Sequence, residues 1–481
     1  MTPLTAPHRL RAHDGESERA RALVAGFEFE QTAFRGTSFY ARALLRVLSE
    51  LGLDTLLLTG ARVSEHPLLE RLSIARQLAE PSTQTRWQRR RAFVRDVMWP
   101  VGPRLVTLEL SDDLLDRVDY LRWVDGCLNR PSVYDFIRMR SGRGWRAYTV
   151  PDCNADVLIT PAPLHVRAPR GVPFVAAFHD LSPLLRLDHP PNDDAREFLC
   201  RIRGMERHAD AILCSSDASR RELVRHFSSL AARCTVIHPP VTLFAEEIAL
   251  ASEPEIERGV LARYEVERHG YLLCIGVIER KKNVRRLVDA YIATRQQLGI
   301  PLLLIGWLGY GSQEVEPALS RGGDWLRHVG YAPQLDKVVL LRNARALVFP
   351  SLYEGFGLPP LEAMQVGCPV LASNIPSVAE ACADAAHLVD CRSARQLAEG
   401  LIQIACDDHL RAGLSARGLR RADQLSLQNY REQLGAFLSR FVSIPAPRNS
   451  PVSVRSAPSP EHTETGCGRR LGADIASASE R

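Results

Sequence analysis

One strand–loop–helix segment, residues 344–364, constrains the fold of this chain more than any other. It begins with a strand-like run, after which Gly355 and Gly357 allow sharp turns and a close approach of the backbone to a ligand. Pro359 and Pro360 then suit a first helical turn, where a missing N–H costs little. A strand that leads through a glycine loop into a helix is typical of α/β proteins.

The start of this helix is predicted to attract anions. The amides of Phe356, Gly357 and Leu358 remain free at the helix N-terminus, and such amides favour phosphate. Two carboxylates flank them, Glu354 in the loop and Glu362 inside the helix. Because a carboxylate beside a phosphate would repel it, we interpret both as hydrogen-bond acceptors for hydroxyls. A ligand that has a phosphate with hydroxyl groups on both sides of it is a sugar nucleotide, so the segment is predicted to bind one.

The same segment resembles the signature of the family 4 retaining glycosyltransferases (glycosyl transferase group 1). Seven residues stand between Glu354 and Glu362 within E-G-F-G-L-P-P-L-E-A-M, and G-C-P-V-L-A-S follows. A strand-to-helix turn of any α/β protein explains the glycines and prolines but not both glutamates. The resemblance covers residues 271–430 almost fully, and 22–60 and 156–241 more weakly. It implies a GT-B fold, in which two Rossmann-like, doubly wound parallel-sheet α/β domains face each other across a cleft.

Composition excludes several classes of protein. The chain has 481 residues, enough for two domains, and no apolar run has the length of a membrane span. The N-terminus is polar and does not resemble a secretory signal. A net charge of +5 is too small to indicate nucleic acid as a partner. The eleven cysteines form no C-x-x-C pairs, which favours a reducing cytoplasm over a disulfide framework, and Cys214 and Cys274 read as small core residues.

Apolar runs alternate with helical patterns along the chain, which predicts parallel doubly wound sheets. Strands are expected at 23–25, 54–59, 156–160, 174–178 and 211–215 in the first half, and at 271–276, 302–305, 328–330, 346–349, 370–372 and 387–389 in the second. A helix is expected over 41–51, with 31–40 as the loop before it.

The chain divides into domains at composition shifts and at the points where the strand pattern stops and restarts. We predict a flexible N-terminus at 1–20, an acceptor-side Rossmann-like domain at 21–245 with an insertion-like segment at 61–150, a linker at 246–265, a donor-nucleotide-binding domain at 266–425, and a disordered tail at 443–481. The resemblance implies that a helix at 426–442 crosses back to the first domain.

A basic turn follows the second-half strand that ends near Gly276. Arg280, Lys281 and Lys282 are three cations at a helix start, where they oppose the helix dipole, whereas a bound diphosphate would explain them. The resemblance matches Lys282 to a lysine that holds the donor diphosphate. Many relatives place an arginine after the glycine, where this chain has Val277, so Arg280 or Lys281 is expected to supply the second cation.

His179 follows the apolar run 174–178 and therefore lies at the carboxyl end of a parallel strand, where open α/β sheets bind ligands. The resemblance matches it to a histidine that contacts the donor sugar. The alternative is a core histidine bonded to the backbone. Asp180 is interpreted as a cap of the next segment, and His238, with two prolines after it, as part of a hinge.

The resemblance also implies contacts at three other turns. Gly36 matches a glycine that lets the acceptor or a phosphate approach, and Arg35 beside it is a candidate anion contact. The nucleotide base is expected near Gly306 and near the turn that contains Tyr331.

Residues 86–99 are basic and aromatic. One interpretation is an amphipathic helix on an anionic membrane, where a lipid-linked acceptor would lie. The other is an ordinary surface helix that packs its aromatic side inward.

Together these features predict a retaining transferase that moves a hexose such as mannose from a nucleoside-diphosphate sugar to a glycan or lipid-linked acceptor. The expected setting is cell-surface polysaccharide or lipopolysaccharide synthesis, in the cytoplasm at the inner face of the membrane. Glu354, His179 and Lys282 are the expected catalytic residues. No D-x-D sequence stands at a strand end, so neither a metal nor another cofactor is expected. The alternatives are a nucleotide-sugar epimerase of GT-B fold and a sugar-nucleotide-binding protein without turnover.

Overall fold

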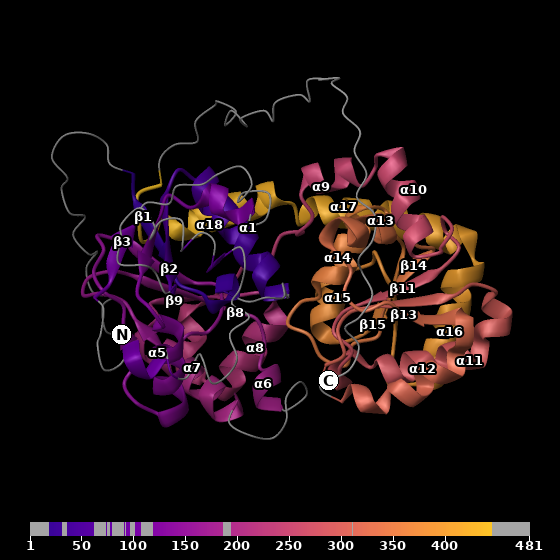
Figure 1. Cartoon of the computed structure of the whole chain (residues 1–481), viewed down its shortest axis with the longest axis horizontal. Helices are drawn as coiled ribbons and strands as arrows, with labels where there is room; N and C mark the ends of the chain where they lie inside the picture. Colours follow the sequence, from indigo (N-terminus) through magenta and orange to yellow (C-terminus); the bar gives the residue numbers. More distant parts are fainter. Residues whose placement is uncertain are drawn as a thin grey trace, which may run out of the picture. The chain divides into compact units, whose positions relative to one another are not determined.

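The computed structural model describes residues 19–30, 36–61, 74, 77–78, 91, 93–96, 102–106, 119–185, 194–309 and 311–444. These residues form two large sheets with helices packed against them (Figure 1). We call the described residues of 19–240 together with 427–444 the first lobe. Residues 241–425, apart from residue 310, are the second lobe.

The first sheet has the order β10-β9-β8-β6-β1-β2-β4-β3, and only β3 runs antiparallel to its neighbour. Its strands are β1 (Arg21–Val24), β2 (Asp54–Thr59), β3 (Arg104–Val106), β4 (Gly126–Asn129), β6 (Val157–Thr160), β8 (Phe174–Phe178), β9 (Ala211–Cys214) and β10 (Cys234–Val236). Helices of this lobe include α1 (Gly36–Glu50), α5 (Val133–Arg143), α6 (Ser182–Leu185), α7 (Asp194–His208) and α8 (Asp217–His226). Apolar side chains cover both faces: Ala22 and Val24 join one core cluster and Leu23 the other.

The second sheet is parallel throughout, with the order β13-β12-β11-β14-β15-β16. Its strands are β11 (Leu272–Ile275), β12 (Leu302–Ile305), β13 (Leu326–His328), β14 (Ala346–Phe349), β15 (Val370–Ser373) and β16 (His387–Val389). The helices are α11 (Val284–Leu298), α12 (Glu316–Gly322), α13 (Gln334–Asn343), α14 (Leu358–Gln365), α15 (Pro376–Cys382), α16 (Ala394–Cys406) and α17 (Asp408–Gln424). The strand order reverses between β11 and β14, and open sheets of this kind bind ligands at that switch point.

The predicted fold class is confirmed, because both lobes carry a doubly wound sheet of the Rossmann type. Strands β2, β8, β12, β14 and β16 have the predicted bounds, and β13 lies two residues earlier than expected. Cys214 and Cys274 are buried as expected, and burial raises the pKa of the Cys274 thiol to about 12.

The structure differs from the predicted elements in three places. Helix α1 begins at Gly36, inside the segment expected to be a loop. The sequence did not indicate this start, because a glycine at the start of a helix looks like a turn residue. The insertion-like segment contributes β3 and β4 to the main sheet. The stretch 246–265 is largely helical, in α9 (Ala245–Leu250) and α10 (Pro254–Arg263), and Ala251 and Val260 join the core of the second lobe.

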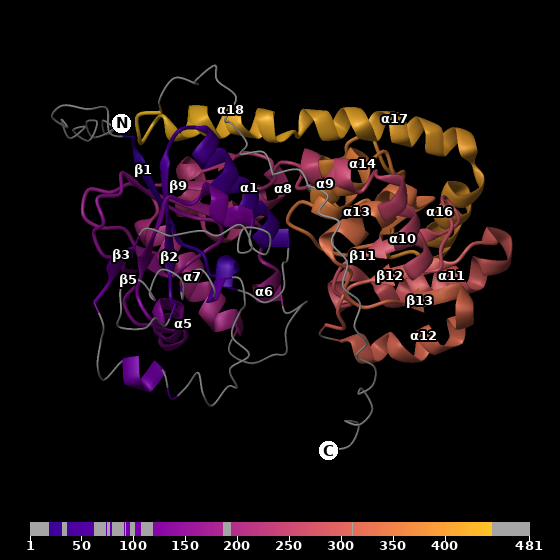
Figure 2. The same cartoon turned by 45° about the horizontal axis from the view of Figure 1, so that its top comes forward.

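The last described helix, α18 (Leu427–Leu438), follows α17 along the chain (Figure 2). Its apolar side belongs to the core of the first lobe, where Leu434 and Leu438 are fully buried. The hydroxyls of Tyr430 and Tyr40 are 3.0 Å apart, which joins α18 to α1. Of the predicted tail at 443–481, the structure describes residues 443 and 444, and the rest lies outside the described residues.

In the part of the chain that the structure describes, no helix combines the length and the apolar character needed to cross a bilayer.

Candidate functional site

The glycine loop between β14 and α14 has the backbone that the sequence predicts, and its two glycines serve different purposes. Gly357 has φ 109° and precedes the first residue of α14, a conformation that side chains strongly disfavour. Gly355 has no such φ, but a Cβ there would lie 2.5 Å from the carbonyl oxygen of His179. Gly355 is therefore required by its contact with the first lobe.

Glu354 and Lys282, which are far apart in the sequence, form an ion pair. Nζ of Lys282 lies 2.6 Å from Oε1 of Glu354, and both side chains are largely buried. Lys282 also lies over the ring of Phe349, with 5.0 Å from Nζ to the ring centroid. A Cβ at Gly276 would lie 3.5 Å from Cε of Lys282, so this glycine leaves room beside the lysine. The pair joins the loops that follow β11 and β14, the two strands at the switch point.

The two cations before Lys282 also have carboxylate partners, one of them remote in the sequence. Arg280 pairs with Glu314, and Nζ of Lys281 lies 3.7 Å from Glu279. The side chain of Lys281 is largely buried, whereas that of Arg280 is about half exposed. Of the two candidates for a second cation, Lys281 is therefore the better placed inside the fold.

Asn283 is a site residue whose role the sequence analysis missed. Its Nδ2 donates to the carbonyl oxygens of Pro350, at 3.2 Å, and Cys391, at 2.9 Å. The amide of Leu352 donates to the carbonyl oxygen of Lys281 at 2.7 Å. These bonds fix the basic turn against the end of β14. The signal in the sequence was the asparagine itself, which tolerates its positive φ of 55° better than most residues.

Glu362 lies inside α14, one turn from its start, and it is 3% exposed. Its Oε1 accepts hydrogen bonds from Oγ1 of Thr242 at 2.6 Å and from Nζ of Lys337 at 2.9 Å. A buried lysine therefore holds one oxygen of Glu362, and the role of this residue toward the donor stays a prediction. Nothing in the sequence around Lys337 marks it as this partner.

His179 has the backbone contact of a core histidine, and its contact with the donor sugar stays a prediction. Its Nε2 lies 2.7 Å from the carbonyl oxygen of Pro161, as in a core histidine, and its ring meets Tyr40 edge-on at 4.9 Å. Burial lowers the pKa of His179, which favours the neutral ring. A neutral ring that donates from Nε2 has only Nδ1 left, as an acceptor. In a contact between this ring and a sugar, the sugar hydroxyl would therefore donate the hydrogen bond and Nδ1 would accept it.

The N-termini of two helices lie close together at Gly36. A Cβ at this residue would be 3.8 Å from Cδ1 of Leu358, so the first residues of α1 and α14 are neighbours. Both helix ends present amides and a partial positive charge, a combination that favours an anion. Arg35 lies outside the described residues.

Glu28, in a short helix after β1, is a buried carboxyl that the sequence analysis missed. It is 2% exposed, and neither carboxyl oxygen has a hydrogen-bond partner among the described residues. Burial raises its pKa from 4.5 to about 7, while its own backbone and the charge of Arg201 lower it slightly. The folded protein therefore keeps this proton to a higher pH than the unfolded chain.

We expect Glu28 to make stability depend on pH. The folded pKa is raised, so the contribution is complete below about pH 4.5 and is lost as the pH rises through about 7. The loss is on the order of 3 kcal/mol. In Glu28→Gln, urea unfolding should show a free energy of unfolding that no longer falls across this interval. An unchanged slope would show that Glu28 does not titrate as described.

An exposed aromatic pair follows β12 and β13. The rings of Trp307 and Tyr331 stack with centroids 5.5 Å apart and an angle of 19°, although they are 53% and 46% exposed. Gly306 precedes Trp307, and a Cβ there would lie 1.9 Å from the carbonyl oxygen of Gly276. The sequence predicts the nucleotide base near these turns but does not indicate that the two rings stack. A tryptophan two residues after the end of the buried strand β12 was the signal for this flat, exposed surface.

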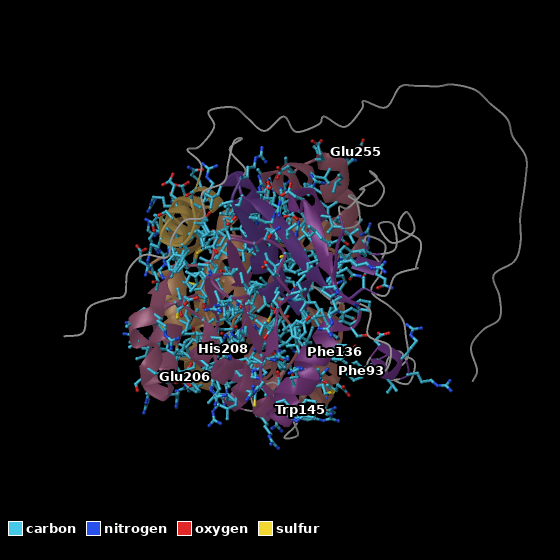
Figure 3. All side chains as sticks on the ribbon, turned by 90° about the vertical axis from the view of Figure 1, so that its left-hand side faces the viewer. Phe93, Phe136, Trp145, Glu206, His208 and Glu255 are labelled. Carbon is cyan, nitrogen blue, oxygen red and sulfur yellow. The ribbon has the colours of Figure 1, made fainter. Side chains whose placement is uncertain are left out.

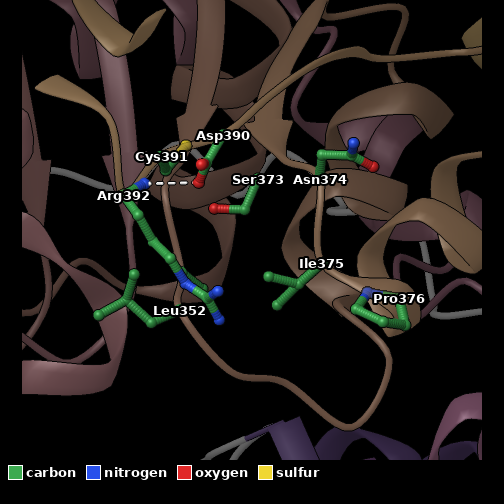
Figure 4. Close-up of a pocket in the computed structure, with 9 residues that line it drawn as sticks. Leu352, Ser373, Asn374, Ile375, Pro376, Asp390, Cys391 and Arg392 are labelled. Atoms are coloured by element: carbon green, nitrogen blue, oxygen red, sulfur yellow. Dashed lines mark hydrogen bonds between the residues drawn. The ribbon is translucent and has the colours of Figure 1, made fainter. Parts of the chain in front are cut away.

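A pocket of about 290 Å³ lies at the carboxyl ends of β14, β15 and β16. Figure 4 shows the side chain of Arg392 extending across it toward Ile375. Oγ of Ser377, next to the pocket wall, donates to the carbonyl oxygen of Glu354 at 2.7 Å. The pocket therefore borders the glycine loop, but neither Glu354 nor Lys282 lines it.

Sequence comparison places the chain among known transferases. The family model described as Glycosyltransferase Family 4 matches residues 103–243, and the one described as Glycosyl transferases group 1 matches 262–421. The O-antigen chain mannosyltransferase B of Escherichia coli is 34% identical over 264 residues, which are 53% of this chain and 67% of that protein. The serotype-specific mannosyltransferase WbdA of the same species is 30% identical over 43% of this chain but 26% of its own length.

Solved structures share the fold at low sequence identity. HepE of Anabaena, solved in complex with UDP-glucose, has a TM-score of 0.56 and 16% identity, over 87% of this chain and 99% of its own. WaaG, a glycosyltransferase involved in lipopolysaccharide biosynthesis, has a TM-score of 0.54 and 15% identity over the same shares. These similarities confirm the predicted GT-B fold.

Proposed function

The chain belongs to the group 1, or family 4, glycosyltransferases, and from this premise we propose that it transfers mannose from a nucleoside-diphosphate sugar to a glycan acceptor in cell-surface polysaccharide synthesis. The choice of mannose is supported by the relatives, since both E. coli proteins are mannosyltransferases. The observation that carries the reaction is the Glu354–Lys282 pair at the switch point of the second sheet, with two helix N-termini converging nearby.

The chemistry follows from where charge develops. As the bond between sugar and diphosphate breaks, negative charge grows on the leaving diphosphate. Lys282, Lys281 and the first amides of α14 are the groups that would stabilise this charge. Because these groups act more strongly on the departing diphosphate than on the intact donor, they lower the barrier rather than only tightening binding.

The carboxylates have orienting roles in this proposal. Glu354 keeps Lys282 in place through Oε1 and offers its other oxygen to sugar hydroxyls. Glu362, anchored by Lys337 and Thr242, would hold the ribose hydroxyls. His179 would accept a hydrogen bond from the sugar through Nδ1. With both glutamates engaged in this way, the leaving phosphate takes the proton of the attacking hydroxyl, which enters from the same face and gives retention.

The assay that tests this function follows free nucleotide and glycosylated product together. Purified protein is incubated with GDP-mannose, or with UDP- and ADP-sugars as alternatives, in the presence and absence of oligomannose acceptors. Nucleotide release that requires acceptor supports transfer. Conversion of the donor sugar without nucleotide release would show an epimerase, and donor binding that raises the melting temperature without turnover would show a binding protein.

We expect Trp307→Ala to weaken donor binding by about 1–3 kcal/mol, the usual contribution of an aromatic ring stacked on a base. Trp307 and Tyr331 offer the exposed aromatic surface that a nucleotide base would cover. Calorimetric titration with the donor measures the effect. Trp325→Ala is the matched control, because Trp325 is a similarly exposed tryptophan of the same lobe outside the pair. Equal losses in both variants would contradict the assignment.

We also propose that the reaction requires no divalent metal, because Lys282, Lys281 and two helix N-termini supply positive charge where the diphosphate would lie. Turnover in excess EDTA should stay within about twofold of the untreated rate, since no cation then contributes to the charge stabilisation. Loss of activity on chelation, with recovery on adding Mg²⁺ or Mn²⁺, would show the opposite.

A lipid-linked acceptor would place the enzyme at the cytoplasmic face of a membrane. Of the basic segment 86–99, the structure describes residues 91 and 93–96. Phe93 packs against Phe136 of α5 with ring centroids 5.0 Å apart (Figure 3), whereas Val94 is 51% exposed. We propose that this side of the first lobe contacts anionic lipid. Cosedimentation with phosphatidylglycerol vesicles but not with phosphatidylcholine vesicles tests it.

A further inference from the structure

The carbonyl oxygen of Gly355 has three serine hydroxyls of the first lobe around it. Oγ of Ser216 lies 2.7 Å away, Oγ of Ser219 2.9 Å and Oγ of Ser215 3.3 Å. These serines occupy the end of β9 and the first turn of α8, and each is at least 96% buried. Ser215 and Ser219 also lie 3.2 Å and 2.5 Å from the carbonyl oxygen of His179, so the three hydroxyls serve two carbonyl groups between them. The first lobe therefore holds the carbonyl group of Gly355 in place.

A second link also reaches α8, in this case from α15 of the second lobe. Glu380 of α15 accepts from the amide of Asp217 at 2.6 Å and from the amide of Ala218 at 3.0 Å, so it caps α8 from the other lobe. It also lies 2.9 Å from Nε2 of His238, the residue expected to belong to a hinge. The ring of His238 stacks on Phe356 at 5.2 Å and 13°. His238 is thus part of a link between the lobes.

The glycine loop contacts the first lobe on both sides of Glu354. Before it, the hydroxyl of Tyr353 accepts from the amide of Leu181 at 3.0 Å and donates to Glu222. After it come the contacts of Gly355 and Phe356 just described. Glu354 itself points to Lys282 in the second lobe. The first lobe thus holds the two backbone neighbours of Glu354, and the second lobe holds its side chain. Both lobes therefore set the position of this carboxylate.

We infer that Ser216, Ser219 and Glu380 are positioning residues for Glu354. This interlock, as we call these three side chains with Gly355, rests on the proposed function and deepens it: the acceptor-side lobe sets the place of the donor-side carboxylate. It acts through the backbone of the loop and touches neither substrate. Its loss should leave the fold and the donor-binding surface in place but allow the loop to depart from the geometry that the reaction needs.

The experiment combines loop exchange with kinetics in the full chain. Amide hydrogen exchange at residues 352–358 is compared in the wild type, Ser216→Ala/Ser219→Ala and Glu380→Ala. Exchange of the loop should speed up about tenfold or more, as expected when one or two hydrogen bonds are lost. In the same variants kcat should fall about tenfold while the donor Kd changes less than about threefold.

Two controls separate positioning from general stability. Ser393→Ala removes the side-chain cap of α16, as Ser216→Ala does for α8, but Ser393 has no contact with the loop among the described residues. It should lower the melting temperature without changing exchange at 352–358. Glu380→Gln keeps an oxygen that can accept from the amide of Asp217 but loses the acceptor for the amide of Ala218, so it should restore part of kcat relative to Glu380→Ala.

The outcomes distinguish the interlock from the function on which it rests. Unchanged loop exchange in both interlock variants overturns the inference, whatever their activity. Faster exchange with wild-type kcat also overturns it, because the loop position would then not matter to the reaction. If the wild type transfers no sugar from any donor, the proposed function fails, and the exchange experiment still decides whether the first lobe holds the loop.

Discussion

Replacing Lys282 with methionine should lower kcat by about 100- to 1,000-fold, the usual cost of removing a group that stabilises developing charge. Methionine keeps most of the side-chain volume beside Phe349 but removes the cation that lies 2.6 Å from Glu354. Donor binding should weaken less than kcat, because the lysine acts mainly on the departing diphosphate. Steady-state kinetics and calorimetric donor titration measure the two quantities separately.

Arg285→Met is the matched control, since Arg285 forms an exposed ion pair with Asp289 on the adjoining helix. An exposed pair contributes little, so this variant should stay within about twofold of the wild type. If Lys282→Met keeps full activity but melts at a lower temperature, Lys282 is structural and the proposed role of the ion pair is wrong.

Lys337→Met should lower the free energy of unfolding by about 3–5 kcal/mol, because it leaves a buried carboxylate without its cation. Lys337 and Glu362 have side chains only 10% and 5% exposed, and with the lysine gone the hydroxyl of Thr242 is the one partner of Oε1 among the described residues. Chemical denaturation measures the loss. Because Glu362 is also proposed to hold the donor ribose, donor affinity should fall in the same variant.

The double variant Lys337→Met/Glu362→Leu separates the cost of an unpaired charge from the contribution of the pair. Apolar replacement of both partners removes the buried charge, so most of the lost stability should return, while donor affinity stays low. A double variant that is as unstable as the single one would mean that packing around Lys337, including its contact with the ring of Phe39 at 4.5 Å, accounts for the loss.

The sequence was sufficient for the parts of the structure that local physics determines. Strands such as β8 and β14 are buried on both faces and therefore read as unbroken apolar runs with clear ends. The glycine loop was also predictable, because turns need particular residues at particular positions. Strand β4, Gly-Cys-Leu-Asn, escaped prediction because neither its length nor its composition is distinctive.

The partners of the site residues could not be predicted, because they come from remote parts of the chain. Lys337 reaches Glu362, and Glu380 reaches the amides of Asp217 and Ala218, across separations that no local pattern reports. The motif identified which residues to examine. Only the fold shows that Glu362 is anchored by a buried lysine and that Gly355 is required by the carbonyl group of His179.

Helix α18 has a consequence for how this protein is made. Its residues Leu434 and Leu438 complete the core of the lobe that begins at β1, although they are synthesised about 400 residues later. During translation, the apolar surface of the first lobe that α18 covers stays open until the second lobe has emerged, and such surface is prone to aggregation. The first lobe is therefore the first to be synthesised but the last to complete its core. An N-terminal fragment ending near residue 240 should need residues 427–444, added in trans or fused to it, to remain monomeric.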